Sequence, residues 1–172
     1  MRNIITLFLA VTVCGICFAA EPVEGYWLSI DEKTGNVTAG WHIYMENGQL
    51  FGKIMSISTE RRGVIAARCR DSYRGFPVAG KVSAMPVSGP PWIFGLTKNT
   101  RNGEWTGGRI INPEDGNDYN CRIIFHPAGT RAGNRTFQSD TLEMRGEIGL
   151  GIGRSQFWQR TDERTAGNLW PN

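Results

Sequence analysis

The chain has 172 residues, of which 40% are hydrophobic and 20% are charged, and its formal net charge is +3. A net charge this small argues against nucleic acid or an acidic surface as the main partner. The length suits a single domain with a sizeable core, and the sequence shows neither an internal repeat nor a low-complexity tract.

Residues 1–19 are predicted to be a secretory signal peptide. Arg2 is their only charged residue, and the apolar run from Ile4 to Phe18 is shorter than the roughly 20 residues that a membrane-spanning helix needs. Cleavage after Ala19 leaves small residues at both recognition positions, and cleavage after Ala20 is the alternative. We therefore expect an exported protein, periplasmic or secreted. Its net charge would be +2, because 18 basic and 16 acidic residues remain once Arg2 is removed.

Cys14 and Cys17 raise the alternative of a lipid anchor. Lipoprotein processing favours a small residue before the modified cysteine, whereas Val13 and Ile16 precede these two. We therefore interpret both cysteines as apolar residues of the leader, and the lipid-anchored form is the less favoured prediction.

The sequence after the leader has strand patterns almost throughout. From Val37 to Glu46 the residues alternate between an apolar and a more polar face, as in a strand with one buried side. Asn47-Gly48 and Asn102-Gly103 are hairpin signals, because both central residues of the favoured turn need positive φ. The pattern predicts an all-β protein, a single antiparallel, mostly up-and-down β-barrel of eight to nine strands, with a sandwich as the alternative. The predicted strands lie near residues 26–31, 36–46, 49–58, 79–85, 92–98, 104–111, 117–125, 141–148 and 154–161.

The barrel domain is predicted to span residues 20–161, and residues 162–172 are predicted to form a C-terminal tail. Residues 59–78 and 126–140 lack a clear strand pattern and are interpreted as long loops. Long loops of a barrel can form a lid or a mouth, and a plain insertion is the alternative.

Two cysteines, Cys69 and Cys121, lie outside the leader. An exported protein can form disulfides, and this one would close a loop of roughly 50 residues, for which chain entropy suggests about 4 kcal/mol. The alternative is a pair of buried free thiols that act as small apolar residues.

Patterns that carry catalysis or bind metals are sparse. His42 and His126 have no acidic or cysteine partner at the spacing of a zinc site, and we expect both at the surface. Glu143, Arg145 and Glu147 share one strand face, which is typical of the solvated outer wall of a barrel. The sequence therefore predicts no catalytic residue, no metal site and no cofactor.

The two ends of the barrel domain resemble those of lipocalins and related calycin barrels. Gly25-Tyr26-Trp27 begins the first strand, and Trp158-Gln159-Arg160 lies near the end of the last. In those barrels a Gly-x-Trp motif packs against an arginine of the last strand. The resemblance implies that Trp27 and Arg160 form a barrel-closing pair, in which a guanidinium lies on an indole face.

An ordered series of motifs also resembles a family of exported bacterial proteins classed as a domain of unknown function. The chain departs from that family at Asn112-Pro113, where Asp-Pro is usual, and at Gly116-Asn117, where Gly-Lys is usual. The resemblance implies a lipocalin-like barrel and brings no activity or catalytic residue. The matching segments are Gly25–Trp27, Gly52–Ile54, Trp105–Ile110, Tyr119, Leu142, Arg145–Gly149 and Gly153–Arg160.

The favoured function is non-enzymatic binding of a small apolar or amphipathic molecule inside the barrel. A barrel of about eight strands can hold such a ligand, or its side chains can fill it completely. The alternatives are an envelope or secreted protein-interaction module with a filled barrel, and an envelope enzyme, which would need polar groups converging in a cleft. The oligomeric state is left open. The predicted ligand-lining residues are Trp41, Ile43, Met45, Tyr119, Ile123, Leu142 and Met144.

Overall fold

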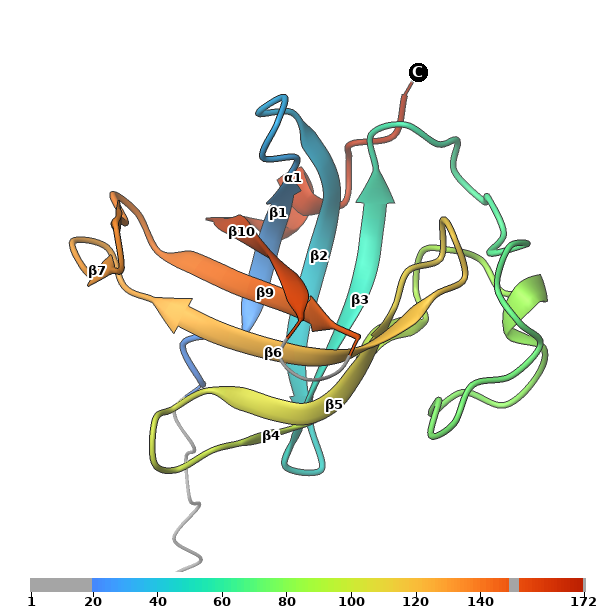
Figure 1. Ribbon diagram of the computed structural model, residues 1–172. Coiled ribbons are helices and arrows are strands. Elements are labelled where there is room, and N and C mark those ends of the chain that lie inside the picture. Colours follow the sequence, from blue (N-terminus) through green and yellow to red (C-terminus); the bar gives the residue numbers. More distant parts are fainter. Residues whose placement is uncertain (1–19, 149–151, 172) are drawn as a thin grey trace, which may run out of the picture.

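The computed structural model describes residues 20–148 and 152–171, and in it eight antiparallel strands form a closed barrel (Figure 1). The order around the barrel is β1-β10-β9-β6-β5-β4-β3-β2. This confirms the predicted all-β barrel; the proposed leader, with Cys14 and Cys17, lies outside the described residues. The elements are β1 (Gly25–Ile30), β2 (Val37–Glu46), β3 (Gln49–Ile57), the 3-10 helix η1 (Val82–Ala84), β4 (Pro91–Lys98), β5 (Trp105–Ile111), β6 (Asp118–His126), β7 (Arg131–Ala132), β8 (Arg135–Thr136), β9 (Thr141–Glu147), β10 (Gly153–Thr161) and the helix α1 (Glu163–Ala166).

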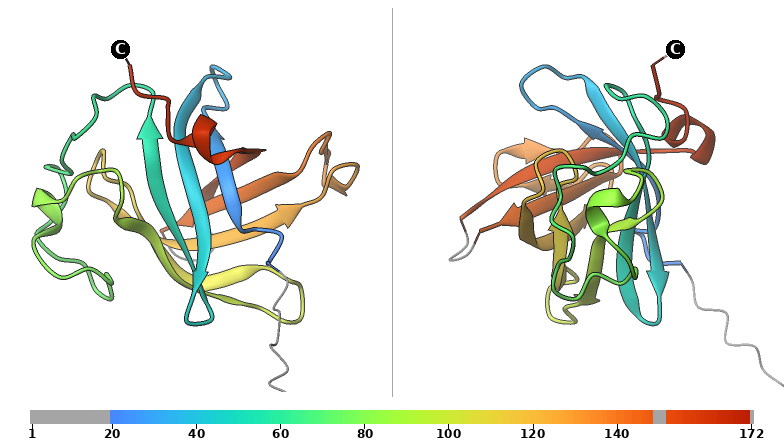
Figure 2. Two further views of the ribbon diagram at one scale, coloured as in Figure 1. Left: turned by 180° about the vertical axis from the view of Figure 1, so that it is seen from behind. Right: turned by 90° about the vertical axis from the view of Figure 1, so that its right-hand side faces the viewer.

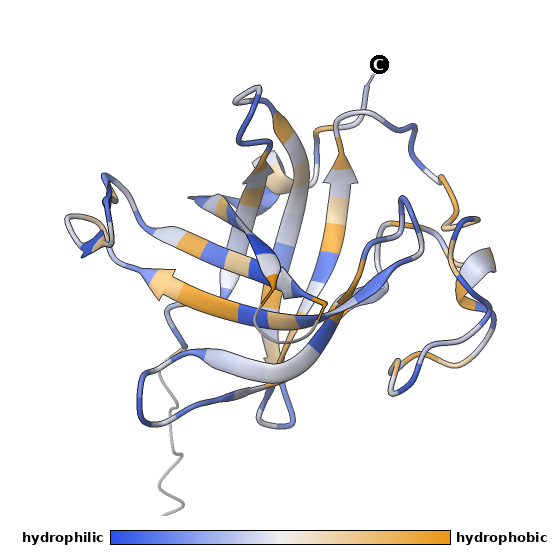
Figure 3. Cartoon of the chain, in the orientation of Figure 1, coloured by the Kyte–Doolittle hydropathy of each residue, from blue (hydrophilic) through white to orange (hydrophobic). Residues whose placement is uncertain are grey.

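The alternation of residue types explains why these segments form the barrel wall. In β2 the side chains of Ala39, Trp41 and Ile43 are buried, and hydrophobic and hydrophilic positions also alternate along other strands (Figure 3). The β2–β3 turn has positive φ at both Asn47 and Gly48, as the hairpin signal required.

Arg160 and Trp27 lie at the seam where the first and last strands close the barrel. They are direct partners in the β1–β10 pairing, and the guanidinium lies 4.2 Å from the centre of the indole ring. Arg160 also donates hydrogen bonds to the carbonyl oxygens of Glu24, at 3.1 Å, and Pro22. The Trp27 Nε1–H donates to the Val23 carbonyl oxygen at 2.9 Å. These contacts attach the segment before β1 to the closed end of the barrel.

The connection between β3 and β4 differs from the prediction, because no strand forms over residues 79–85. The chain instead runs beside the barrel and contains η1 (Figures 1 and 2). Val82 is buried, as a strand pattern requires, but its N–H donates to the Asp71 carbonyl oxygen of the same connection. Phe76 anchors this connection on β4 by packing against Trp92 and Phe94, with ring centres 5.9 and 5.6 Å away.

The segment after β10, predicted as a tail, packs on the outside of the barrel (Figure 2). Asp162 caps α1 by accepting the Thr165 N–H at 2.9 Å. Ser56 on β3 donates to the Ala166 carbonyl oxygen at 2.6 Å and accepts the Leu169 N–H at 3.0 Å. The C-terminal segment is therefore part of the folded domain. Within the described ranges, no helix has the length and apolar character needed to span a membrane.

Candidate functional site

A cavity of about 590 Å³ occupies one half of the barrel interior and is open at one end. Its inner wall is mainly apolar but also includes Ser29, Thr38 and Gln156, and polar and charged side chains gather with two exposed isoleucines at its rim. The inner wall includes Trp41, Ile54, Ile110, Tyr119 and Met144. The rim includes Asp31, Asn112, Glu114, Ile148, Ile152 and Arg154.

The predicted ligand-lining residues divide between this cavity and a filled half of the barrel. Trp41, Tyr119 and Met144 line the cavity. Ile43, Ile123 and Leu142 are fully buried in the packed core beyond it, and Met45 is partly buried near the closed end, where its N–H donates to Glu24 at 3.1 Å. These four residues do not line the cavity. Alternation along a strand predicts which side chains face the barrel interior, but it does not predict how far along the barrel axis they lie.

Two tryptophans form the boundary between the open and the filled halves. Trp41 stacks on Trp158, with ring centres 4.8 Å apart and an interplanar angle of 24°. Trp158 Nε1–H donates to Gln156 Oε1 at 3.1 Å, whereas Trp41 Nε1 is buried without a hydrogen-bond partner among the described residues. An unpaired buried donor costs about 1–3 kcal/mol.

Sequence reasoning missed the cavity residues of β3, β5 and β10. Ile54 and Ile110 lie in segments predicted to be strands, but irregular pairings between Gly40 and Trp41 and between Trp105 and Gly108 shift the alternation nearby. Gln156 lies two residues before Trp158 and faces inward with it. Because residues two apart in a strand share a face, an inward position for Trp158 would have predicted an inward position for Gln156.

The two cysteines are free and buried in the structure, so the predicted disulfide is not formed. The Cys69 Cα lies 3.1 Å from where a β-carbon would stand on Gly116, at the turn before β6. Cys121 lies five residues further along β6, on the order of 15 Å away, whereas a disulfide needs the Cα atoms within about 7 Å. Burial raises the pKa of the Cys121 thiol well above its ordinary value.

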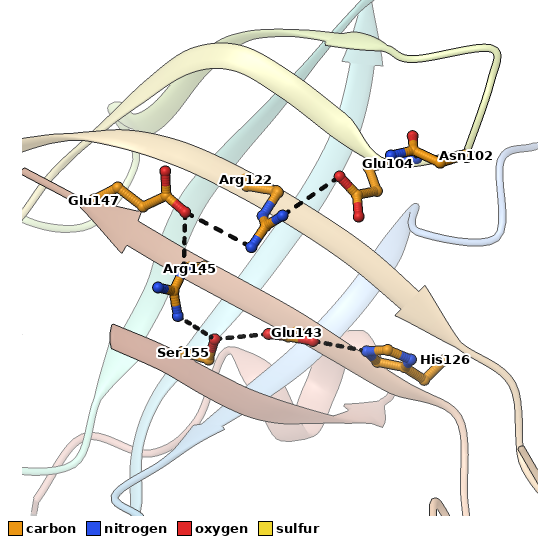
Figure 4. A network of polar contacts seen from close by, with 8 residues as sticks. All are labelled: Asn102, Glu104, Arg122, His126, Glu143, Arg145, Glu147 and Ser155. Carbon is orange, nitrogen blue, oxygen red and sulfur yellow. Dashed lines mark hydrogen bonds and ion pairs between the residues drawn. The ribbon is translucent and has the colours of Figure 1, made fainter. Parts of the chain in front are cut away.

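The charged row on β9 is not the solvated surface that the sequence indicated. Glu143, Arg145 and Glu147 have side chains only 17%, 23% and 23% exposed, respectively. They belong to a chain of polar contacts that runs from Glu104, just before β5, across β6, β9 and β10 (Figure 4). Arg145 Nε donates to Glu147 at 2.8 Å, and Arg122 lies 3.6 Å from both Glu147 and Glu104.

His126 lies at the other end of this network and is also more buried than predicted. Its ring stacks on Phe137 at 4.2 Å, and Nε2 lies 2.9 Å from Glu143 Oε2. Ser155 donates to Glu143 Oε1 at 2.6 Å, which places the carboxylate between the serine and the histidine (Figure 4). In a nucleophilic triad the histidine must contact the serine directly, so these contacts favour a structural role.

Metal ligands do not gather in the described part of the chain, where no group of three or more His, Cys, Asp or Glu side chains is placed to hold an ion.

A family model described as "Uncharacterized protein conserved in bacteria (DUF2147)" matches residues 25–160. The chain belongs to this family. The DUF2147 match begins at Gly25 in β1 and ends at Arg160 in β10, so it contains all of the barrel strands except Thr161, and the pair at the seam. A search of curated protein sequences found no match.

The barrel of this DUF2147 protein is similar to a solved structure described as "Protein HP1028 from the human pathogen Helicobacter pylori belongs to the lipocalin family". The TM-score is 0.60 with 15% sequence identity, over 88% of this chain and 90% of the other. At that identity the likeness shows the fold alone, which is a lipocalin-like barrel.

His42 lies on the outer face of β2, where Tyr26 and Tyr44 flank its ring at 4.7 and 5.2 Å. Burial, and secondly the charge of Lys53, lower the pKa of His42 below its ordinary value. The unfolded chain therefore takes up this proton more readily, and stability falls as the pH drops below about 6.5. We expect the urea midpoint to fall less between pH 7.5 and pH 5 in His42→Phe than in the wild type. Equal losses in the two proteins would contradict this.

Proposed function

We propose that this protein binds a small apolar or amphipathic molecule in the barrel cavity and does not act as an enzyme. The observation that carries the proposal is the cavity of about 590 Å³, because small-molecule sites usually measure about 300–1,000 Å³. We also propose that the protein is exported, periplasmic or secreted, as the leader-like residues 1–19 suggest.

The chemistry of the lining supports an apolar or amphipathic ligand. Trp41, Ile54 and Met144 offer aromatic and aliphatic surface, while the charges of Asp31 and Arg154 lie at the rim. An ion taken into the inner half would lose its hydration without gaining a charged partner, which is costly. A ligand would therefore place its apolar part inward and its polar part near the rim.

A second candidate function is contact with another envelope component through the open end of the barrel. Ile148 and Ile152 favour it, because they are 73% and 63% exposed beside the cavity. Large apolar side chains this exposed are expected where a surface meets a partner.

Filling the cavity tests the first proposal. Gly146 lines the cavity, and a β-carbon there would lie at ordinary contact distances of 3.5 Å from Tyr119 and 3.8 Å from Ile110. Gly146→Ala should therefore fold and bind normally, whereas Gly146→Leu extends into the cavity and should weaken binding of N-phenylnaphthylamine about tenfold. Fluorescence titration measures both variants, and thermal unfolding checks their folding.

Native mass spectrometry of protein purified from its own periplasm provides an independent measurement. A retained small molecule in the wild type, lost in Gly146→Leu, is the expected result. If the wild type carries no small molecule and binds no apolar probe, the proposed function is wrong.

A further inference from the structure

A second cavity of about 370 Å³ adjoins the barrel cavity at its rim. It lies between the connection that follows β3 and the turn between β5 and β6. Ile57, Pro113 and Glu114 line both cavities, so the two spaces are neighbours that share these three residues in their walls. A ligand that reached past these residues from one cavity into the other could be longer than one that the barrel cavity holds alone.

The walls of the second cavity are held in place by hydrogen bonds. Val64 and Ala66 bond to Val87 and Met85 through their backbones, each at 2.9 Å, which joins the two ends of the β3–β4 connection. Arg68 Nη1 donates to the Glu114 carbonyl oxygen at 3.2 Å across to the β5–β6 turn. The cavity is therefore preformed, which lowers the entropic cost of binding.

Gly116 allows the β5–β6 turn to lie close to the backbone of Arg68 and Cys69 in the β3–β4 connection. It has a φ of +75°, and a side chain there would collide with the Arg68 backbone and come within 3.1 Å of the Cys69 Cα. The Tyr73 hydroxyl donates to the Gly116 carbonyl oxygen at 2.6 Å, which holds the connection on the turn.

The two cavities differ in chemistry. The inner barrel cavity is lined mainly by apolar groups such as Trp41 and Met144, whereas three exposed charged residues line the second cavity: the acids Glu60 and Glu114 and the base Arg68. A polar head group that carries both a cation and an anion could place its cation near Glu60 or Glu114 and its anion near Arg68.

We propose that the ligand is a single-chain amphiphile with a zwitterionic head group, whose chain enters the barrel and whose head occupies the second cavity. This inference rests on the proposed function, since it requires the barrel cavity to bind the chain. It adds the length of the ligand, its orientation and the side chains that select its head.

The test compares dodecylphosphocholine with dodecanol, which has the same chain without the head, by displacement of N-phenylnaphthylamine below micellar concentrations. The wild type should bind dodecylphosphocholine about tenfold more tightly, as expected for charge-assisted contacts. Ala67→Trp fills the second cavity from an exposed position and should remove that preference without changing dodecanol affinity. Ala79→Trp, on the same connection but lining neither cavity, should keep the preference.

The outcomes separate this inference from the proposed function. An unchanged preference in Ala67→Trp, or no preference in the wild type, overturns the head-group site while dodecanol binding still supports the barrel site. Arg68→Gln should reduce the preference as well, and free phosphocholine should not displace the probe. If neither amphiphile binds the wild type, the proposed function fails, and this inference fails with it.

Discussion

Arg160→Ala should destabilise the protein by about 2 kcal/mol, since the change removes a cation–π contact and charge-assisted hydrogen bonds at the barrel seam. The guanidinium lies over Trp27 and holds the carbonyl oxygens of Pro22 and Glu24, and its Nε lies 3.3 Å from Asp140. The Arg160 side chain is 35% exposed, so solvent screens part of these interactions. The expected loss of stability is therefore smaller than the sum of the individual contacts. Thermal unfolding should show a midpoint lowered by about 6 °C.

Two further variants test whether the loss of stability comes from the contacts at the seam or from the removal of a positive charge in general. Arg160→Lys keeps the charge but loses the planar fork, so it should recover less than half of the lost stability. Arg154→Ala removes an exposed arginine from the rim end of the same strand and should change stability by less than about 0.5 kcal/mol. If Arg160→Ala were as stable as Arg154→Ala, the seam contacts would contribute nothing.

Much of the barrel could be predicted because its signals are local. Alternation over Val37–Glu46 marks one strand, and Asn47-Gly48 marks a turn whose positive φ values only a few residue types accept. The seam pair could be expected because the two terminal motifs resemble those of lipocalins, in which a Gly-x-Trp of the first strand packs against an arginine of the last.

The contents of the barrel could not be predicted in the same way. Alternation assigns Trp41 and Ile43 to one face of β2. Side chains from other strands fill the closed end of the barrel, and for that reason Ile43 is packed there whereas Trp41 lines the cavity. Bulges add to the difficulty, because the irregular pairing between Trp105 and Gly108 shifts the residues that face inward.

Contacts between distant segments explain the remaining differences. Val82 has the spacing of a strand residue, yet it is buried within a connection whose position depends on Phe76 and Tyr73. The sequence places His126 at the end of a strand and predicts that it is exposed, but Phe137, eleven residues later, stacks on its ring. Such burial comes from the path of the chain in space, and no local pattern reports it.

Gly40→Ala should separate the C-terminal segment from the barrel and destabilise the protein by about 3 kcal/mol. A β-carbon on Gly40 would overlap the Ala166 carbonyl oxygen and lie 2.6 Å from the Ala166 Cα, which is backbone and cannot rotate away. Relieving that overlap would strain the hydrogen bonds of Ser56 to Ala166 and Leu169. We expect a lower thermal midpoint and proteolytic cleavage within residues 162–171 under conditions where the wild type resists it.

The matched control is Gly146→Ala, a strand glycine where an added methyl group meets only ordinary contacts. It should leave both stability and proteolysis unchanged. Ser56→Ala removes the hydrogen bonds to the segment without adding a collision, and the buried acceptor and partly buried donor that it leaves unpaired should cost about 1–3 kcal/mol. Because Gly40→Ala acts through displacement, it should expose the segment to protease at least as much as Ser56→Ala does. A Gly40→Ala protein with wild-type resistance would mean that α1 does not pack on β2 in solution, and that the segment after Thr161 behaves as the tail that its sequence suggested.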